Sequence, residues 1–316
     1  MEQLLVSVII PNFNHASFLD ERIRSILNQT YQNFELIILD DCSTDDGASQ
    51  AVIETYRSNP HVSHIVYNDV NSGSTFKQWQ KGFDLAQGEL IWIAESDDSC
   101  SPSFLETVVQ PFEQDSQCVL SFSRSMRIDG QGAIKDVYGT QKYMNASFLI
   151  DGKRFINRYL KKQNIVVNAS SAVFRKRILS GIDPHYMTLR GCGDWLFWIH
   201  LAECGKVSYT PEKLNYYRYH SDNTTSHKDA DGTNDREMLE IFNELYAGHY
   251  YSRWEFLAMK TSRYLWRLRE LPFSSREEQK RFLTAWNLSG LELVMGRLLL
   301  FCTNIKEGIA HRIRLR

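Results

Sequence analysis

The chain has 316 residues, of which 43% are hydrophobic and 23% are charged, and its formal net charge is −2. This is the composition of an ordinary globular protein, and it argues against a nucleic-acid-binding protein, which would carry a clear positive excess. The six cysteines show no C-x-x-C spacing, so neither a zinc site nor a disulfide framework is expected, and the cytosol is the favoured compartment.

Three apolar runs in the first part of the chain each end abruptly in polar side chains. They are residues 6–10 before Pro11, residues 34–39 before Asp40 and Asp41, and residues 90–94 before Asp97 and Asp98. Each run is typical of a buried strand. Residues 1–11 lack a basic start and a long apolar core, so we expect a first strand there and not a signal peptide.

Between these runs, apolar residues recur with helical spacing. The two clearest faces are Phe18, Ile23, Ile26 and Leu27, and Phe76, Trp79, Phe83 and Leu85. The alternation of strand and helix predicts an α/β fold with a mostly parallel central sheet flanked by helices. Such sheets bind ligands at their carboxyl edge, where adjacent aspartates favour a hard divalent metal carrying a phosphorylated ligand.

The order of these motifs resembles glycosyltransferase family 2, the inverting nucleotide-sugar enzymes with a GT-A (Rossmann-like) fold. The resemblance covers roughly residues 4 to 220 and is carried by residues 7–47, by Asn71-Ser72-Gly73 and by the run IWIAESDD that ends at Asp98. It implies a GT-A domain over residues 1–235, a nucleotide-diphosphate sugar donor and a metal cofactor, Mn²⁺ or Mg²⁺. Residues 236–316 would form a C-terminal helical extension.

The expected nucleoside site centres on Asp41 and Phe13. The Asp41 carboxylate can accept the imide N–H of uracil or thymine, which favours a UDP-sugar, with a dTDP-sugar as the second choice. Phe13 offers a ring on which the base can stack, while Pro11 and Asn14 shape the loop. The alternative is that Asp41 only caps the helix that follows.

Two residues near the Asn-Ser-Gly turn complete the expected donor contacts. Asn71 belongs to the turn itself, and Lys77 follows it on the next helix, where its ammonium group would contact a phosphate. The alternative for Lys77 is a solvated position on the helix surface.

By resemblance to the family's Asp-x-Asp-like motif, Asp98 would coordinate the metal that bridges the two phosphates. Asp97 would reach the ribose, or the metal through a water molecule. Ser96 occupies the first position of the motif, so no second direct carboxylate ligand is assigned and the ion would keep several waters. The alternative is that both aspartates cap the helix after Pro102.

Inversion by direct displacement needs a carboxylate that removes the proton of the acceptor hydroxyl. The family places this base near a helix start late in the domain, and Asp194 matches that position because it follows two glycines and precedes an amphipathic helix. Asp194 is therefore the expected catalytic base. A helix N-cap is the alternative role, and the two can coexist.

A late histidine, His220, resembles one that approaches the metal or the diphosphate in relatives, and it is assigned as a second metal ligand. Arg218 or His227 would add to charge neutralisation, although a lone histidine is often structural. The polar stretch 221–234 is typical of a lid that orders over the donor.

The last part of the chain is basic, with 13 Lys or Arg against 6 Asp or Glu from Tyr251 to Arg316. Its helical pattern is too interrupted by charge to span a bilayer. Aromatic and leucine faces beside arginines are typical of an interfacial helix on anionic lipid, which would place the protein on the inner face of the cell membrane. The alternative is a helical appendage or a homo-oligomer interface.

Two functions of different classes follow. The first is a metal-dependent inverting glycosyltransferase, of hexosyl or N-acetylhexosaminyl type, that extends a bacterial-type surface polysaccharide on a glycan or polyprenyl-linked glycan acceptor. The second is a non-catalytic nucleotide-sugar-binding or scaffolding relative. A phosphotransfer domain of flavodoxin type would also use aspartates at strand ends, but it would not need the Asp194 region.

Overall fold

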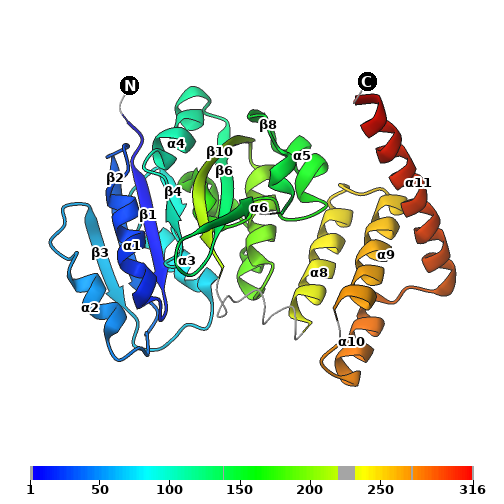
Figure 1. Ribbon diagram of the computed structural model, residues 1–316, viewed down its shortest axis with the longest axis horizontal. Coiled ribbons are helices and arrows are strands. Elements are labelled where there is room, and N and C mark those ends of the chain that lie inside the picture. Colours follow the sequence, from blue (N-terminus) through cyan, green and yellow to red (C-terminus); the bar gives the residue numbers. More distant parts are fainter. Residues whose placement is uncertain (1–2, 138, 220–231, 272, 315–316) are drawn as a thin grey trace. The chain divides into compact units, whose positions relative to one another are not determined.

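The structure is a computed structural model that describes residues 3–137, 139–219, 232–271 and 273–314. The chain forms two compact units (Figure 1). The first comprises Met1–Thr188 and Gly193–Ser221, and the second comprises Leu189–Cys192 and Asp222–Arg316. The boundary expected at 235–236 falls inside helix α8 (Thr233–Ala247), which packs on α9 in the second unit, so the first unit ends earlier than the sequence indicates.

A ten-stranded sheet with the order β3-β2-β1-β4-β9-β6-β10-β5 forms the core of the first unit, and β7 and β8 pair with β6 and β10. The strands are β1 (Val6–Asn12), β2 (Phe34–Asp40), β3 (Val62–Tyr67), β4 (Leu90–Ile93), β5 (Ser99–Cys100), β6 (Cys118–Ile128), β7 (Ile134–Val137), β8 (Phe148–Asp151), β9 (Ala172–Arg175) and β10 (Lys206–Arg218). The four strands from β3 to β4 are parallel, and β9 joins them to the second half through antiparallel pairing with β4 and β6. The expected α/β architecture is confirmed.

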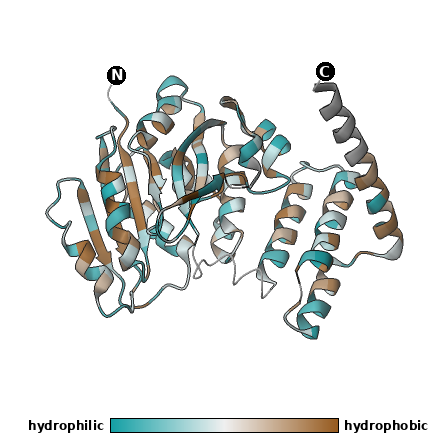
Figure 2. Ribbon diagram, viewed as in Figure 1, coloured by the Kyte–Doolittle hydropathy of each residue, from teal (hydrophilic) through white to brown (hydrophobic). Residues whose placement is uncertain are grey.

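Helices cover the strands of the first unit. They are α1 (Ala16–Leu27), α2 (Ala48–Glu54), α3 (Thr75–Leu85), α4 (Phe104–Gln114), α5 (Gly152–Phe155) and α6 (Gly193–Glu203), with short helical turns at Gly139–Tyr143, Ile156–Leu160, Ala169–Ser171, Lys176–Gly181 and Pro184–Thr188. Strands β1, β2 and β4 are buried along their whole lengths, which is why their sequences are continuous apolar runs (Figure 2).

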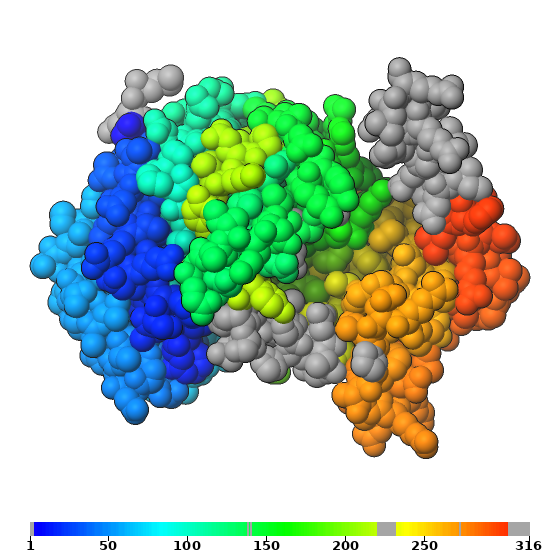
Figure 3. All heavy atoms as spheres, in the orientation of Figure 1, coloured from blue at the N-terminus to red at the C-terminus, as the bar shows by residue number. Residues whose placement is uncertain are grey.

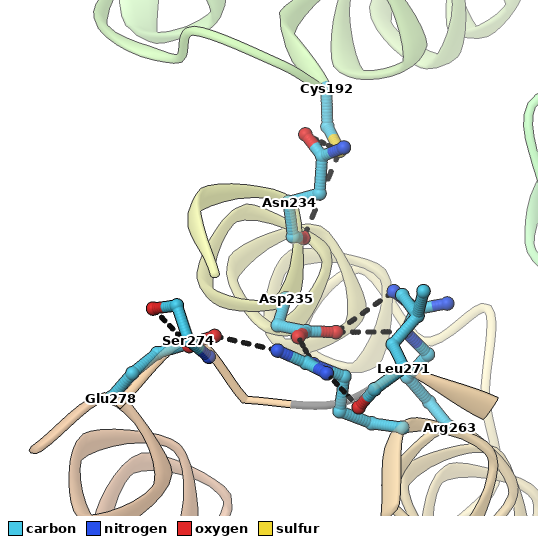
Figure 4. A network of polar contacts seen from close by, with 8 residues as sticks. Cys192, Asn234, Asp235, Arg263, Leu271, Ser274 and Glu278 are labelled. Carbon is cyan, nitrogen blue, oxygen red and sulfur yellow. Dashed lines mark hydrogen bonds and ion pairs between the residues drawn. The ribbon is translucent and has the colours of Figure 1, made fainter. Parts of the chain in front are cut away.

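The second unit consists of α8, α9 (Arg253–Glu270), α10 (Arg276–Trp286) and α11 (Gly290–Arg314). A buried ionic network joins the first three of these helices (Figure 4). The guanidinium of Arg267, on α9, lies 2.5 Å from Asp235 of α8 and 2.6 Å from Glu278 of α10, and Arg263 pairs with the same aspartate at 2.8 Å. Because Arg267 is fully buried, both partners are needed to offset its desolvation.

Helix α11 presents an apolar stripe to solvent. Leu291, Val294, Leu298 and Phe301 are 71%, 57%, 60% and 65% exposed. Within the described residues, no single helix is long and apolar enough to cross a membrane, although Arg276–Trp286 and Gly290–Cys302 pass the same test together as a pair bent by 77°.

Candidate active site

The carboxyl ends of β1, β2 and β4 meet at one edge of the sheet, because β1 pairs in parallel with both of the other strands. Asn12 stands in register with Asp40, and its side-chain amide donates to the Asp40 carboxylate at 2.7 Å. Asp40 also accepts from the backbone N–H and the hydroxyl of Ser43. Asp40 therefore organises the loop after β2, while the polar groups predicted from the strand ends gather at this edge.

The loop after β1 is fixed by Asn14, as expected. Asn14 has a φ of 57°, a left-handed conformation that asparagine tolerates well. Its side chain donates to Thr44 and accepts from the Thr44 N–H at 2.6 Å. Pro11 is buried near the end of β1, two residues after the last pairing of β1 with β4. Phe13 follows in the loop, and its side chain is 41% exposed. An exposed aromatic ring on a rigid loop suits base stacking.

Asp41 is buried at this edge, and its carboxylate accepts four hydrogen bonds. The donors are the side-chain amides of Asn68 and Gln78 and both the N–H and the hydroxyl of Ser72. Asp45, and not Asp41, caps α2 by accepting from the N–H of Ser49. The capping alternative for Asp41 therefore does not hold.

Asn71 and Lys77 lie close to Asp41. The Asn71 amide donates to the Asp41 carbonyl and accepts from the Gly73 N–H, so Asn71 shapes the turn. Lys77 is exposed and donates to the Ser72 carbonyl at 3.1 Å. Of the two, only Lys77 presents a charge to solvent near this edge.

The turn after β4 concentrates negative charge. Burial raises the pKa of Glu95 to about 8, and the carboxylates of Asp97 and Asp98 add to the rise. Burial likewise raises the pKa of Asp98 to about 7, with a further contribution from Asp97. Trp79 of α3 donates to the Glu95 carboxylate at 3.1 Å. Three carboxylates in one turn favour a cation among them.

Asp98 is completely buried, and both of its carboxylate oxygens are used inside the protein. One oxygen accepts from Asn168 and Ser170, and the other accepts from the backbone N–H of Arg218 at 3.0 Å. This arrangement does not favour Asp98 as the direct metal ligand that the sequence suggests, because an oxygen of the ligand must reach the ion. Asp97 in the same turn is only half-buried.

Arg218 performs a different task from the expected neutralisation of phosphate charge. Its guanidinium is buried and donates to the carbonyls of Asp97, Asp129 and Gly130 and to the Glu21 carboxylate. Arg218 therefore connects the acidic turn, residues 95–98, to the end of β10 through hydrogen bonds.

A second buried cation lies beneath the acidic turn. Arg22 of α1 is fully buried, and its guanidinium lies 4.8 Å from the centre of the Trp92 ring. Its positive charge offsets part of the rise that burial causes in the pKa values of Glu95 and Asp98. Neither Arg22 nor Arg218 is an exposed side chain at the sheet edge where β1, β2 and β4 end.

Asp194 lies half-buried in the first turn of α6. Its carboxylate accepts from the side-chain amide of Asn164 at 2.8 Å and from the Trp195 N–H at 2.7 Å. The preceding residue must be glycine, because a Cβ on Gly193 would lie 2.4 Å from the Tyr186 carbonyl and 2.6 Å from the Phe76 ring. Asp194 is thus inside the helix and not at its N-cap, with one oxygen oriented by Asn164.

The segment before Asp194 is fixed independently. Within the second unit, the Glu237 carboxylate of α8 accepts from the backbone N–H groups of Arg190, Gly191 and Cys192 at 2.7, 2.8 and 2.7 Å. The Gly-Cys-Gly stretch that the sequence marks as flexible is therefore anchored up to the residue before Gly193.

His220, His227 and most of the predicted lid at residues 221–234 lie outside the described residues. Among the residues that the structure describes, no group of three or more His, Cys, Asp or Glu side chains is arranged to hold a metal. A metal bound with a diphosphate does not need one, since Mg²⁺ is commonly held by one or two carboxylates plus phosphate and water oxygens.

Comparison with known proteins decides the family. Residues 7–182 match the model of glycosyl transferase family 2, which is more than half of the chain. The chain belongs to glycosyl transferase family 2. The match covers the sheet edge with Asp40 and Asp41, the acidic turn of residues 95–98 and strand β9. It ends before Asp194.

Individual relatives agree with the family. The chain is 33% identical over 110 residues to the glycosyltransferase GlyG of Streptococcus pneumoniae, covering 35% of this chain and 36% of that protein. It is 24% identical over 251 residues to the poly(ribitol-phosphate) beta-N-acetylglucosaminyltransferase TarP of Staphylococcus aureus, covering 78% and 72%. The chain spans less than half the length of two of its curated relatives, GlyG and the Bacillus subtilis protein TuaG.

The fold is shared with a solved structure of S. aureus TarS in complex with UDP-GlcNAc. The TM-score is 0.67 at 17% identity, and the alignment covers 89% of this chain and 79% of that one. At this identity the likeness shows the fold alone, and it confirms the expected GT-A architecture.

Sequence reasoning missed several residues that build this site. Glu95 was visible as an acid two positions before Asp97, a spacing that itself marks a pair of carboxylates. Gln78 and Asn164 carry no such pattern, since each acts on a partner at least 30 residues away in the chain.

Proposed function

We propose that the protein is an inverting glycosyltransferase that moves a sugar from a UDP-sugar to a glycan or lipid-linked glycan of a cell-surface polysaccharide. The observation that carries the proposal is the presence of three carboxylate groups in the first unit. These are a buried carboxylate at the base-binding edge, Asp41, an acidic turn beside it at Glu95 to Asp98, and the oriented carboxylate of Asp194.

The uracil base would lie between Phe13 and Asp41. Four donors hold Asp41 in place, three of them on Oδ1 and one, the Ser72 hydroxyl, on Oδ2. Oδ2 would accept the imide N–H of uracil and would repel adenine N1, which is itself an acceptor. The preference for UDP is supported by the likeness to S. aureus TarS, a protein that was solved in complex with UDP-GlcNAc. A dTDP-sugar presents the same imide edge and stays the second choice.

The acidic turn fits a divalent cation by its donor chemistry, because hard carboxylate oxygens crowd there. Burial raises the pKa values of Glu95 and Asp98, and the charge of Asp97 raises them further. Asp97 would hold Mg²⁺ or Mn²⁺ and Glu95 would contact the ribose, while Asp98 and Arg218 keep the turn rigid. A bound ion would supply positive charge against the diphosphate as it leaves. Lys77 would add a second positive charge from the α3 side.

In the transfer step, an acceptor hydroxyl oxygen forms a bond to the anomeric carbon while the bond from that carbon to the diphosphate oxygen breaks. The electron pair of the broken bond leaves with UDP, and the hydroxyl proton passes to Asp194. Asn164 fixes one Asp194 oxygen and the Trp195 N–H fixes the other, and a carboxylate held in this way keeps lone pairs that can accept the hydroxyl proton. Attack opposite the leaving group inverts the configuration.

The choice of a surface polysaccharide is supported by the relatives, among them TarP, a poly(ribitol-phosphate) beta-N-acetylglucosaminyltransferase. In the same proposal, the protein carries out the transfer at the inner face of the cell membrane. The exposed apolar stripe of α11 supports this location.

Calorimetric titration with UDP, dTDP, GDP and ADP, with and without Mn²⁺, tests the donor site. We expect UDP to bind most tightly and Mn²⁺ to strengthen its binding. Phe13→Ala should weaken UDP binding, whereas Ile134→Ala, a control at a residue that is 60% exposed elsewhere in the first unit, should not. Tighter binding of ADP than of UDP would refute the nucleoside assignment.

The rival function is a nucleotide-sugar-binding protein without catalysis. It predicts the same titrations but no release of UDP from any UDP-sugar, with or without acceptor. Release of UDP that is lost in an Asp194→Asn variant would distinguish the glycosyltransferase from the binding protein.

A further inference from the structure

A groove of about 610 Å³ opens in the first unit beside the segment that carries Asn164. Its lining comes from residues 143–148 and from residues 158–165, and none of the described residues that line it is Asp or Glu. In Figure 3 this part of the chain is drawn in green. A volume of this size suits a ligand of a few sugar units.

The groove has an aromatic wall that is fixed from below. The rings of Phe148 and Tyr159 are stacked, with centroids 5.5 Å apart and 9° between their planes. Tyr209, buried beneath Phe148 at 5.3 Å, donates its hydroxyl to the Met144 carbonyl at 3.0 Å, and the buried Arg124 donates to the same carbonyl. The wall is therefore part of the core and does not depend on a ligand to form.

Cations stand over these aromatic rings. The guanidinium of Arg158 lies 5.2 Å from the centre of the Tyr159 ring, and the Lys142 ammonium lies 4.9 Å from that of Tyr143, a residue that is 73% exposed. Lys162 is exposed and, with Arg158, is the second basic residue among the described residues of the lining. Among the described residues that line the groove, Arg158 and Lys162 are basic and none is acidic, a lining that suits an anion.

The groove is tied to the candidate base. Gln163 and Ile165 line it, and the residue between them, Asn164, donates to Asp194 at 2.8 Å. The carbonyl of Ile165 accepts from the fully buried Gln141, which fastens this segment to the turn that precedes Tyr143. A molecule held along the groove would therefore lie next to the segment that orients the base.

We propose that this groove binds the acceptor and that the acceptor is an anionic glycan, carrying phosphate or carboxylate groups along its chain. The inference rests on the proposed function and adds a substrate class to it. Sugar or polyol units would lie against Tyr143 and the stacked pair of Phe148 and Tyr159, while Arg158 and Lys162 would contact the negative groups. The donor contacts at Phe13 and Asp41 are separate from all of these residues.

Binding of three probes of similar length tests the proposal. They are a polyol-phosphate oligomer, an oligogalacturonate and a neutral maltooligosaccharide, each titrated into the protein with UDP and Mn²⁺ at low and at high salt. We expect at least one anionic probe to bind at least about tenfold more tightly than the neutral one, with an advantage that shrinks at high salt. Preference for the phosphate or the carboxylate probe identifies the anionic group.

Variants locate the site. Arg158→Gln with Lys162→Gln should remove the preference for the anionic probe, whereas Arg24→Gln with Lys213→Gln, which removes two exposed charges elsewhere in the first unit, should keep it. Tyr143→Ala should weaken binding of any probe that binds. Melting temperatures and UDP affinity should stay the same in all of these variants, because the altered side chains are exposed.

Two results overturn the inference. One is a neutral probe that binds as well as both anionic probes, and the other is an anionic preference that survives the double substitution in the groove. If the wild-type protein binds UDP with Mn²⁺ but behaves in either of these ways, only the groove assignment fails. If UDP itself does not bind, the proposed function fails.

Discussion

The backbone N–H of Arg218 donates to the carboxylate of Asp98 at 3.0 Å, joining residues 120 positions apart in the chain. The bond connects the end of β10 to the acidic turn after β4, and the Arg218 guanidinium secures the same turn through the Asp97 carbonyl. The acidic turn is thus held from beneath by the second half of the sheet. Its geometry depends on the folding of the whole first unit.

Arg218→Lys should destabilise the fold by about 2 to 4 kcal/mol, because a lysine ammonium cannot serve the carbonyls and the carboxylate that the buried guanidinium contacts. Urea denaturation measures the loss, and UDP affinity should fall with it as the acidic turn loosens. Arg127→Lys is the matched control, since the ion pair of Arg127 with Asp136 is exposed on both sides and its loss should cost less than about 1 kcal/mol. Equal effects of the two substitutions would contradict the role of Arg218.

Asp97→Asn and Asp98→Asn should separate metal binding from stability. Asp97→Asn should leave the melting temperature nearly unchanged and weaken Mn²⁺-dependent UDP binding at least about tenfold, as expected for loss of a charged ligand. Asp98→Asn should lower the free energy of unfolding by about 1 to 3 kcal/mol. The new side-chain NH₂ group would face either the Arg218 N–H or the donors of Asn168 and Ser170, and two donors cannot bond to each other. The reverse pattern would restore Asp98 as the metal ligand.

Asp194→Asn should keep donor binding and lower the rate of transfer by about 10² to 10⁴, the usual contribution of a general base. Asn164→Ala should lower the rate less and shift its pH profile, since Asn164 acts through Asp194. Radiolabelled sugar transfer and UDP calorimetry on the same samples would give both quantities. An Asp194→Asn variant that kept more than about a tenth of the rate would exclude this residue as the base.

Glu35 should make stability depend on pH. Burial would raise the pKa of this carboxyl, but hydrogen bonds from the Ser7 hydroxyl and the Gln87 N–H outweigh it and leave the pKa below its usual value. The stabilisation is therefore present above the unfolded-state pKa of about 4.3 and is lost as the pH falls through the folded-state value. Glu35→Gln should destabilise the protein at pH 7 and lose less stability than the wild type on acidification. Parallel pH curves in urea would contradict this account.

The apolar stripe of α11 should hold the protein on anionic membranes, aided by about 1 kcal/mol from each basic residue near the surface. The wild type should float with anionic liposomes and less with neutral ones or at high salt. Leu291→Glu with Leu298→Glu should abolish flotation, whereas Ile134→Glu should not. If the wild type ignores anionic liposomes at low salt and the double substitution breaks an oligomer, the stripe is a self-association face.

The sequence by itself determined the parts of this protein that depend on neighbours in the chain. Apolar runs that end in polar groups specify buried parallel strands, and parallel strands place their carboxyl ends at one edge, so the positions of Asn12, Asp41 and the acidic turn followed directly. The left-handed backbone of Asn14 is a local feature of the same kind, but its bonds to Thr44 join residues 30 positions apart and depend on the fold.

Tertiary structure alone decided which of these polar groups are enclosed in the protein and which stay accessible. Asp97 and Asp98 are adjacent and identical in type, yet one is half-buried and the other is enclosed by Asn168, Ser170 and Arg218. Those partners come from β10 and from the turn before β9, and no local pattern announces them. Burial and hydrogen bonding between distant segments set the role of a carboxylate here, because desolvation and donor geometry, and not residue type, determine what it can bind.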